Sequence, residues 1–582
     1  MKKTVLVSRA MAVGALLCLV GGFGVTQSNE EWGPAKIAYD DYIKRPSLQM
    51  RTRGRVKLAQ TQHPGAWDIL TKSYAKPEAP KDHVKYLLTS IVARHFQDEQ
   101  WTDKWVAWRE ANKAPEDAWL WYRGLVLHQQ NRGEDDLLAC ASNDKNPLWL
   151  RAAALEALAE NGSEKVLQWW LTKLDEAPKW KDVERAVWIE CCTHNFWKES
   201  HSLGRPDEAG NVYRNVGLKL IPLIDNKLTN ERTSLVMARY LREIFAIEHL
   251  YVNAQPWLDL LLNPKKEVER DSKYKPAAPP TKFVGIETHG KRIVYVIDMS
   301  DSMCIPFTGK EKEEIKKPPP PKGPVTGRGA DGGKGKEEEK KEEEKKKGLE
   351  DDLPWDKIAI RWDVVREYLK LSLRGLQEDQ FFCVIWFGTE AGTLKTTKGL
   401  VPATKANVEA AVREVDSIKK GAATQDRKHG TLRGNTNLHG GLHRAYKVKK
   451  NGMGKEYEYV DPTTWFDGAD TIFVLTDGDP TDDDWAIVDK RDPWDQTGDP
   501  ETRVKHADQE FLRFPGPYGY WVPATQGEWI LDDARRLNLF RKCEIHTIGI
   551  GVGGEGFRDL TGLLPGLAKI GRGECKLVGT GE

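Results

Sequence analysis

The stretch IVYVIDMSDSM, from Ile293 to Met303, decides the fold class of the second half of this chain. It begins with a run of β-branched and aromatic residues, which is typical of a buried strand. It ends in Asp298, Ser300 and Ser302, three oxygen-bearing side chains that come directly after the apolar run. We therefore expect a strand that delivers oxygen ligands to one edge of a sheet.

Two later segments place further oxygen-bearing side chains at the ends of secondary-structure elements. Thr436 lies in GNTNLHGGLHRA, just before a helix-like stretch, and Asp477 lies in DTIFVLTDGDP, at the end of a second buried-strand pattern. In an open α/β sheet, ligands gather outside the carboxyl ends of the strands, where Asp298 also falls. Hydroxyl and carboxylate oxygens without cysteine suit Mg²⁺, Mn²⁺ or Ca²⁺ better than Zn²⁺, and we expect Mg²⁺ first. The alternative is that these are ordinary turn and helix-cap residues.

These residues follow the order D-x-S-x-S, then T, then D, and comprise Asp298, Ser300, Ser302, Thr436 and Asp477. In this pattern the chain resembles the von Willebrand factor A (vWA) domain family over roughly residues 283–578. The resemblance implies a metal-ion-dependent adhesion site (MIDAS) in which Ser300, Ser302 and Thr436 contact the ion and the two aspartates often act through water. It also implies a protein partner that supplies an Asp or Glu carboxylate. Asp301 stands where glycine is frequent in the family, and its carboxylate either tightens metal binding or points to solvent.

The elements around these motifs predict an α/β Rossmann-like (vWA) domain over residues 283–582. Strand patterns occur at FVGI, RIVYVID, FFCVIWFG, IFVLTDG, CEIHTIGIGV and ECKLV, and helix patterns at about 355–376, 405–418, 438–448 and 528–540. Alternating strands and helices predict a mostly parallel central sheet that is covered on both faces.

Residues 30–265 carry a helical pattern, so we expect a multidomain chain whose first domain is all-α. The clearest unit is PLWLRAAALEALAENG, in which Leu150, Ala154 and Leu158 share one helix face. With the helix that follows, this unit resembles a HEAT-type repeat. The resemblance implies a HEAT-like solenoid, an architecture that is typical of scaffolds for other proteins.

Tryptophans are frequent in this helical region, and Trp101, Trp105 and Trp108 recur at helical spacing. Packing in the core is the favoured interpretation. The alternative is an aromatic platform that binds glycans.

The chain begins with a segment that resembles a secretory signal peptide, over residues 1–27. Lys2, Lys3 and Arg9 precede an apolar run, and small residues follow it. We therefore expect a secreted, periplasmic or cell-surface protein. Membrane association is expected only if this segment remains as an uncleaved anchor.

Composition indicates two segments without a core of their own and gives no sign of a nucleic-acid partner. Residues 266–282 predict a linker, and residues 308–353, rich in Pro, Gly, Lys and Glu, predict a disordered insertion within the vWA domain. The chain has 88 Lys and Arg against 87 Asp and Glu, a net charge of +1, which argues against binding to nucleic acid by overall charge.

His439 and His443 lie one helical turn apart, a spacing that can hold Zn²⁺. The residues between them supply no glutamate base, and we favour a structural or surface role for both.

Taken together, these patterns predict a divalent-cation-dependent protein-binding protein of the cell envelope or exterior, acting in adhesion or as an assembly scaffold. The sequence contains no recognisable catalytic set, so we do not expect an enzyme. Two alternatives remain open. One is a secreted hydrolase or glycan-processing protein whose tryptophan-rich half binds the substrate, and the other is a metal-free structural scaffold.

Overall fold

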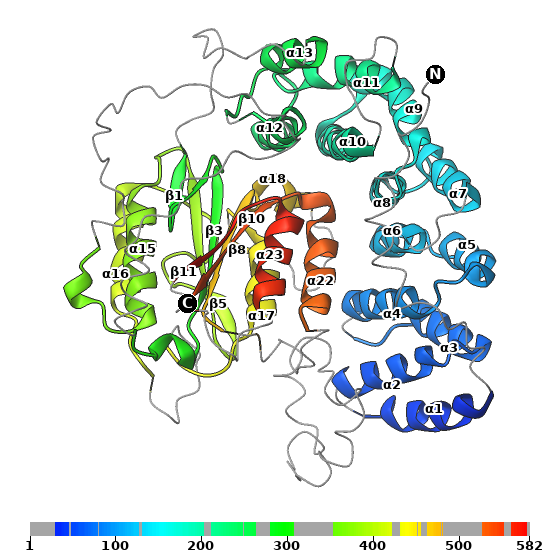
Figure 1. Cartoon of the computed structure of the whole chain (residues 1–582), viewed down its shortest axis with the longest axis horizontal. Coiled ribbons are helices and arrows are strands. Elements are labelled where there is room, and N and C mark those ends of the chain that lie inside the picture. The colour runs from blue at the N-terminus through cyan, green and yellow to red at the C-terminus, as the bar shows by residue number, and fades with distance from the viewer. Residues whose placement is uncertain are drawn as a thin grey trace, which may run out of the picture.

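The structure is a computed structural model, and it describes residues 29–45, 48–79, 81–126, 131–202, 211–247, 249–263, 280–307, 353–421, 431–450, 452–454, 462–478, 480, 526–551 and 560–578. Helices form the first half of the molecule, and a sheet with its own helices forms the second half (Figure 1). The predicted signal peptide, the predicted linker up to residue 279 and the predicted insertion up to residue 352 lie outside the described residues.

The helical half is an all-α region, as expected. Its helices are α1 (Asn29–Tyr42), α2 (Leu48–Gln60), α3 (Pro64–Ala75), α4 (Lys81–His95), α5 (Thr102–Glu110), α6 (Ala118–Val126), α7 (Asn131–Ser142), α8 (Leu148–Glu160), α9 (Glu164–Lys173), α10 (Asp182–Ser202), α11 (Val212–Leu220), α12 (Glu231–Phe245) and α13 (Ala254–Leu262). They form a curved double row in which α4, α6, α8, α10 and α12 face the second half, while α5, α7, α9, α11 and α13 lie outside (Figure 1). The inner row therefore joins the two halves.

Local signals explain where these helices begin and end, and α12 shows them most clearly. The side chain of Asn230 accepts a hydrogen bond from the backbone N–H of Thr233 at 2.8 Å, which satisfies a donor of the first turn. The helix ends at Ala246, whose φ of 51° is left-handed.

The tryptophans of the helical half are core residues. Those that are buried include Trp101, Trp105, Trp108, Trp119, Trp121, Trp170 and Trp188. The indole of Trp67 stacks on Trp101 with 5.4 Å between ring centroids and meets Trp105 edge-on at 5.3 Å. Core packing is thus confirmed for Trp101, Trp105 and Trp108.

The second half contains a mixed, mostly parallel sheet of seven strands, which confirms the expected sheet. Its strands are β3 (Arg292–Asp298), β4 (Phe381–Phe387), β5 (Ala391–Thr393), β6 (Val401–Pro402), β9 (Thr471–Thr476), β10 (Glu544–Ile550) and β11 (Cys575–Val578). The strand order is β11-β10-β9-β3-β4-β5, with β6 also paired to β4. The first five strands of that order run parallel, and β5 and β6 are antiparallel. The motif strand β3 therefore lies inside the sheet, between β9 and β4.

Two predicted elements are wrong in detail. FVGI is not one strand: β1 (Thr281–Phe283) and β2 (Ile286–Thr288) form an antiparallel hairpin outside the main sheet. Its turn consists of Val284 and Gly285, whose φ angles of 48° and 76° suit a tight hairpin turn. The helix expected at 355–376 is divided into a short 3₁₀ turn, η7 (Trp355–Lys357), and α15 (Arg361–Arg374), because the backbone is extended at Ile358 and Ile360.

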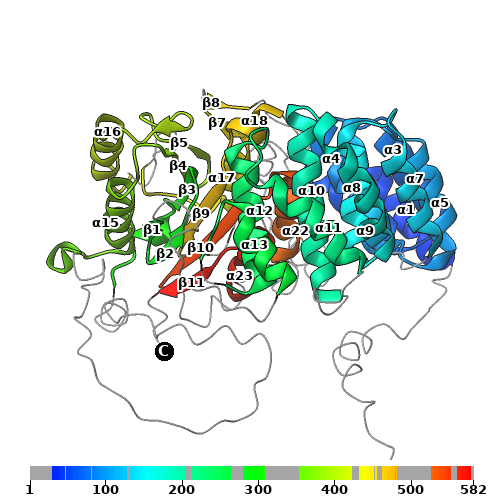
Figure 2. The ribbon, with the colours of Figure 1, turned by 90° about the horizontal axis from the view of Figure 1, so that it is seen from above.

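Helices cover both faces of the sheet, so the molecule is layered (Figure 2). One face carries α15 and α16 (Lys405–Asp416), and the other carries α17 (Leu438–Lys447), α22 (Gln526–Arg541) and α23 (Leu560–Gly571), with α18 (Pro462–Asp467) and the small hairpin of β7 (Val448–Lys449) and β8 (Gly452–Met453) nearby. Side chains of β3 alternate between the two faces. Tyr295 belongs to the core under α15, whereas Val294 and Val296 belong to the core under α17.

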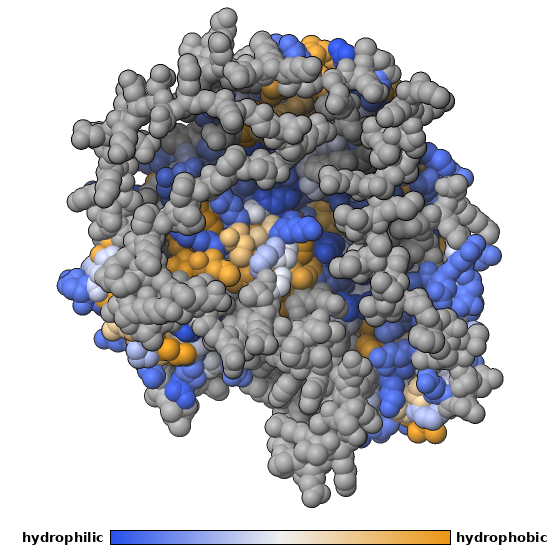
Figure 3. Space-filling view, in the orientation of Figure 1, coloured by the Kyte–Doolittle hydropathy of each residue, from blue (hydrophilic) through white to orange (hydrophobic). Residues whose placement is uncertain are grey.

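One of the two hydrophobic clusters extends across both halves. The cluster that contains Val296 and Leu442 of the α/β half also contains Leu87 and Leu155 of the inner helices. Trp149 packs against Trp465 and Phe540 across this junction, with ring centroids 4.7 and 4.9 Å apart. Figure 3 shows mostly hydrophilic side chains at the right-hand rim of the view, over the helical half, and hydrophobic ones near the middle, over the sheet half. The apolar side chains of the inner helices pack toward the sheet half within the shared cluster.

Buried polar contacts also cross the junction. Arg239 of α12 donates hydrogen bonds to the backbone oxygen of Asp470 at 3.0 Å and to Oγ1 of Thr471 at 2.9 Å, and it forms an ion pair with Glu544 at 3.0 Å. Ser90 of α4 donates to Asp532 of α22 at 2.7 Å. Because each of these contacts needs a particular geometry, they fix how the halves are placed against each other.

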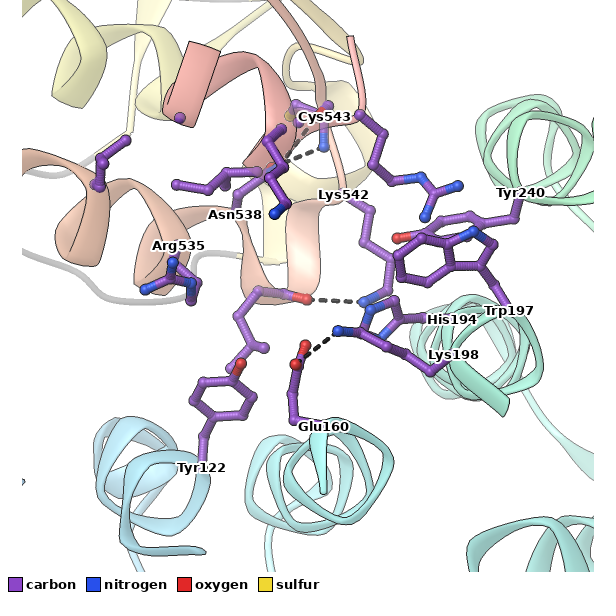
Figure 4. Close-up of a pocket in the computed structure, with 17 residues that line it drawn as sticks. Tyr122, Glu160, His194, Trp197, Lys198, Tyr240, Arg535, Asn538, Lys542 and Cys543 are labelled. Atoms are coloured by element: carbon purple, nitrogen blue, oxygen red, sulfur yellow. Dashed lines mark hydrogen bonds and ion pairs between the residues drawn. The ribbon is translucent and has the colours of Figure 1, made fainter. Parts of the chain in front are cut away.

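A cavity of about 410 Å³ opens at this junction (Figure 4). Glu160 accepts a hydrogen bond from Lys198 at 2.6 Å at its edge. The guanidinium of Arg572 lies between the rings of Trp197 and Tyr240, 3.9 and 3.7 Å from their centroids. The lining of the cavity is therefore partly polar, although the two halves that enclose it share apolar packing.

No helix within the described residues combines the length and the apolar character needed to cross a bilayer.

Candidate metal centre

The five residues of the predicted site come together at one edge of the sheet. Asp298 is the last residue of β3, and Asp477 directly follows β9. These strands are neighbours and run parallel, so their carboxyl ends meet. Ser300 and Ser302 lie in the turn after β3, where the 3₁₀ turn η5 (Asp301–Cys304) begins, and Thr436 lies in the loop before α17.

The three hydroxyl groups face one small space. Oγ of Ser300 and Oγ of Ser302 are 2.7 Å apart, and Ser302 donates a hydrogen bond to Oδ1 of Asp477 at 2.6 Å. A methyl group placed on Gly478 would lie 3.5 Å from Oγ of Ser302 and 3.9 Å from Oγ1 of Thr436. Glycine at this position keeps the space beside the two hydroxyls open.

Asp298 organises the turn that carries the serines. Its Oδ1 accepts a hydrogen bond from the backbone N–H of Ser300 at 2.7 Å, and its Oδ2 accepts one from Oγ1 of Thr476 at 2.6 Å. Both oxygens of this carboxylate are therefore engaged in holding the loop and the adjacent strand. Thr476 was not singled out by the sequence analysis, because it reads as an ordinary strand residue.

Backbone hydrogen bonds fix the loop of Thr436 to the same sheet edge. The N–H of Asp301 donates to the oxygen of Gly434 at 3.0 Å, and the N–H of Arg433 donates to the oxygen of Met299 at 2.9 Å. The N–H of Asn437 donates to the oxygen of Gly388 at 2.7 Å. The three hydroxyls are consequently held in place by main-chain contacts, which is the preorganisation that an ion site needs.

The site concentrates buried negative charge. Burial, and then the charge of Asp477, raises the pKa of Asp298 to about 7. Burial also raises the pKa of Asp477, although hydrogen bonds from Ser302 and Arg361 oppose this effect. Nη1 of Arg361 donates to Oδ2 of Asp477 at 2.9 Å, and its Nη2 donates to the oxygen of Gly551 at 3.0 Å. The positive charge of Arg361 therefore offsets only one of the two buried carboxylate charges.

Arg361 is a residue of the site that sequence reasoning missed. It is the first residue of α15 and is buried. In the sequence it is one of many basic residues after the Lys- and Glu-rich segment, and nothing local marks its contact with Asp477. Asp301, by contrast, is exposed, which favours the solvent-facing alternative for its carboxylate.

The donor set fits a small hard cation. All five side chains offer oxygen, and hydroxyl and carboxylate oxygens are the ligands that Mg²⁺, Mn²⁺ and Ca²⁺ take. Neighbouring ligands of an octahedral Mg²⁺ are about 3 Å apart, because each bond is about 2.1 Å long. The separation of 2.7 Å between the two serine oxygens is close to that value. Ser300, Ser302 and Thr436 would hold the ion, and the two aspartates would position them and supply negative charge.

Comparison with known proteins adds no relative: no family model matches this chain, and no curated protein matches it either. The function of the site consequently has to be inferred from its own donor atoms, charges and place in the fold.

Proposed function

We propose that this protein binds other proteins through a divalent cation, as an adhesion protein or an assembly scaffold, with Mg²⁺, Mn²⁺ or Ca²⁺ held by a vWA-type MIDAS. One observation carries the proposal. Three hydroxyls and two buried carboxylates from three separate segments meet at the carboxyl ends of β3 and β9. The first half, with its double row of helices, would be a HEAT-like solenoid that supports the binding domain and offers an outer surface of its own.

The charge of the site supports a carboxylate as the group that the partner supplies. Two aspartates and Arg361 leave one buried negative charge when both carboxyl groups are ionised. A divalent cation would change this to one positive charge. An Asp or Glu side chain of the partner would neutralise it and take a coordination position that Mg²⁺ otherwise leaves to water.

Binding is favoured over catalysis because the carboxylates are already engaged. Each oxygen of Asp298 and each oxygen of Asp477 accepts a hydrogen bond within the site. A general base must instead reach the proton of a substrate or of a water molecule. Trp101, Trp105 and Trp108 are buried, so these three tryptophans do not offer the aromatic surface that the hydrolase alternative would use.

The N-terminal 27 residues, which resemble a secretory signal peptide, extend the proposal to the location of the protein. A secretory segment would place the protein in the periplasm, at the cell surface or in the medium, and an uncleaved segment would tether it to a membrane. In each of these places the partner carboxylate would come from an exposed Asp or Glu side chain of another protein.

Calorimetric titration of Mg²⁺, Mn²⁺ and Ca²⁺ into the chelator-treated full chain tests the proposal. We expect one saturable equivalent of ion, and we expect Asp298→Ala to weaken its affinity by about a hundredfold or more, because the turn of Ser300 loses its anchor. The matched control is Asp379→Ala, which removes an exposed carboxylate just before β4, at the amino ends of the parallel strands and away from the site. Equal affinity in the wild type and in Asp298→Ala would contradict the proposal, and so would a wild type that binds none of the three ions.

A further inference from the structure

A second cluster of side chains that could bind a metal ion lies between α17 and α22, where the sheet half meets the helical half. His439 and His443, one turn apart on α17, both direct Nε2 at the same carboxylate oxygen of Asp533 on α22. The two distances to Oδ2 are 2.8 and 2.7 Å, and one ligand atom from each residue lies within 4.8 Å of the others. All three side chains are buried, so the surface part of the structural or surface role that the sequence favoured for the histidines is wrong.

A third histidine faces this cluster from the helical half. The ring of His83, on α4, has its centroid 6.2 Å from that of His439 and 6.3 Å from that of His443. The rings of His439 and His443 are 4.3 Å apart. In a tetrahedral site two histidine rings bound to one ion have centroids about 5 Å apart, given bonds of about 2.0–2.1 Å. The rings of His439 and His443 thus lie near the spacing of two ligands of one ion, and the ring of His83 lies farther from each of them.

The other oxygen of Asp533 is held in place by an arginine. Nε of Arg536 donates to Oδ1 of Asp533 at 2.6 Å, and the guanidinium lies 4.7 Å from the ring centroid of Tyr86, again from α4. Such a contact orients a carboxylate so that its second oxygen remains directed at the histidines, as outer partners of metal ligands commonly do.

We propose that His439, His443 and Asp533 form a transition-metal site of the Zn²⁺ class, next to the ring of His83. Two imidazoles and one carboxylate make a mixed nitrogen and oxygen set, unlike the all-oxygen set of Ser300, Ser302 and Thr436. Ligand atoms around a tetrahedral ion are about 3.3 Å apart. The histidine Nε2 atoms now lie 2.8 and 2.7 Å from Oδ2 of Asp533, so binding an ion would require these atoms to separate by about half an ångström. The inference is independent of the proposed function, since it uses none of the residues of the oxygen site.

The position of this site indicates a structural role. It joins α17 to α22 within the sheet half and lies against α4 of the helical half. Helix α17 begins two residues after Thr436. An ion at this point would therefore fix both the junction of the two halves and the helix behind the hydroxyl of Thr436.

The competing explanation is a hydrogen-bonded network without metal, in which both imidazoles donate to Asp533. The variants His443→Gln and Asp533→Asn separate the two, because each keeps a polar group of similar reach but is a poor ligand for Zn²⁺. The full chain, stripped with a chelator, is titrated with Zn²⁺ and with Co²⁺, whose visible absorption reports its coordination. His249→Gln is the control for weak binding to other histidines, and Asp298→Ala is the control for the oxygen site.

We expect the wild type, His249→Gln and Asp298→Ala to bind one equivalent of Co²⁺ with an intense visible absorption band, and Zn²⁺ to displace it. His443→Gln and Asp533→Asn should bind at least about a hundredfold more weakly. We also expect Zn²⁺ to raise the melting temperature of the stripped wild type, because it binds the folded state. A wild type that binds less than stoichiometric Zn²⁺ and melts at the same temperature with and without it would overturn the proposal, even if the variants fail to fold. Unchanged affinity in folded His443→Gln would overturn it as well.

Discussion

At the scale of single residues, the oxygen site depends on a carboxyl group that is costly to ionise. Asp298 is buried beside Asp477, and both effects favour its protonated form, so its pKa rises to about 7. A cation that binds beside these carboxylates must displace the proton or bind only after it has left. The affinity of the site for metal therefore depends on pH near pH 7, where exposed carboxyl groups, with a pKa of about 4, are already ionised.

This linkage predicts the pH dependence of Mg²⁺ binding. A raised pKa means that Asp298 is protonated below about pH 7, so affinity should fall about tenfold for each pH unit below that value and level off above it. Calorimetric titrations from about pH 5 to about pH 8 measure the effect, because this range lies on both sides of the raised pKa and above the ordinary carboxyl pKa of about 4. An affinity that stays constant across the range would show that no proton is released and would contradict this description of the site.

The sequence was informative about the donors of the site and silent about their supports. Ser300 and Ser302 follow a strand within a short motif, so local pattern and strand-end geometry were enough to place them together. Thr476 and Arg361 contribute through contacts with Asp298 and Asp477, which lie far from them in the sequence or on another strand. Such long-range contacts depend on the register of the sheet, and single-sequence patterns do not determine register.

At the scale of secondary-structure elements, α17 must approach the sheet closely for the loop of Thr436 to reach its place. Gly441 makes this approach possible. A Cβ atom at Gly441 would lie 2.8 Å from Cγ1 of Val296 and 3.1 Å from Cδ1 of Phe387. Any larger side chain would push the helix away from β3 and β4.

We predict that Gly441→Ala lowers the free energy of unfolding by about 1–3 kcal/mol through overpacking. Gly562→Ala, in α23, is the matched control, because a Cβ there would meet no atom within 4 Å. Its effect should be neutral or stabilising by up to about 1 kcal/mol, since alanine favours the helix. Urea denaturation of both variants measures the difference, and a Gly441→Ala protein as stable as its control would show that α17 has room to move.

Helices and strands were predicted correctly from the sequence where the pattern of apolar residues was long. The prediction was wrong where a short turn divides an element. The amphipathic pattern of α12 and the apolar run of β3 are long enough to specify their own structure. The hairpin of β1 and β2 was missed because its turn begins with Val284, a residue type that rarely adopts a positive φ. Its packing supplies the compensation: Phe283 contacts the rings of Tyr295 and Phe473.

At the scale of the whole molecule, the helical half and the sheet half are parts of one structure. Their apolar side chains form a continuous cluster, and Arg239 reaches from α12 to the start of β9 and β10. The sequence predicted an all-α region and an α/β region, but it did not predict this junction. The partners of the junction are separated by hundreds of residues, and each alone looks like an ordinary charged or apolar residue.

The junction predicts the cost of removing Arg239. Arg239→Ala would leave the buried carboxylate of Glu544, whose pKa is now held low by Arg239 and His546 against the effect of burial, without its main cation. We expect a loss of about 3–5 kcal/mol, as for other buried ion pairs broken on one side. Lys36→Ala, which breaks a half-exposed pair with Asp40 one helical turn away, should cost at most about 0.5 kcal/mol. Denaturant unfolding measures both, and equal stabilities would contradict a buried, specific junction.

The claim that a metal at the oxygen site accepts a carboxylate has a direct test in the water-proton relaxation of the Mn²⁺-loaded full chain. Bound Mn²⁺ that retains exchangeable water speeds relaxation, and a ligand that replaces the water reduces the effect. We predict a strong enhancement for the wild type, none for Asp298→Ala, and a decrease when acetate is added but not when acetamide is added. Enhancement that is unchanged by acetate, or that persists in Asp298→Ala, would contradict the claim that this site binds partners through a cation.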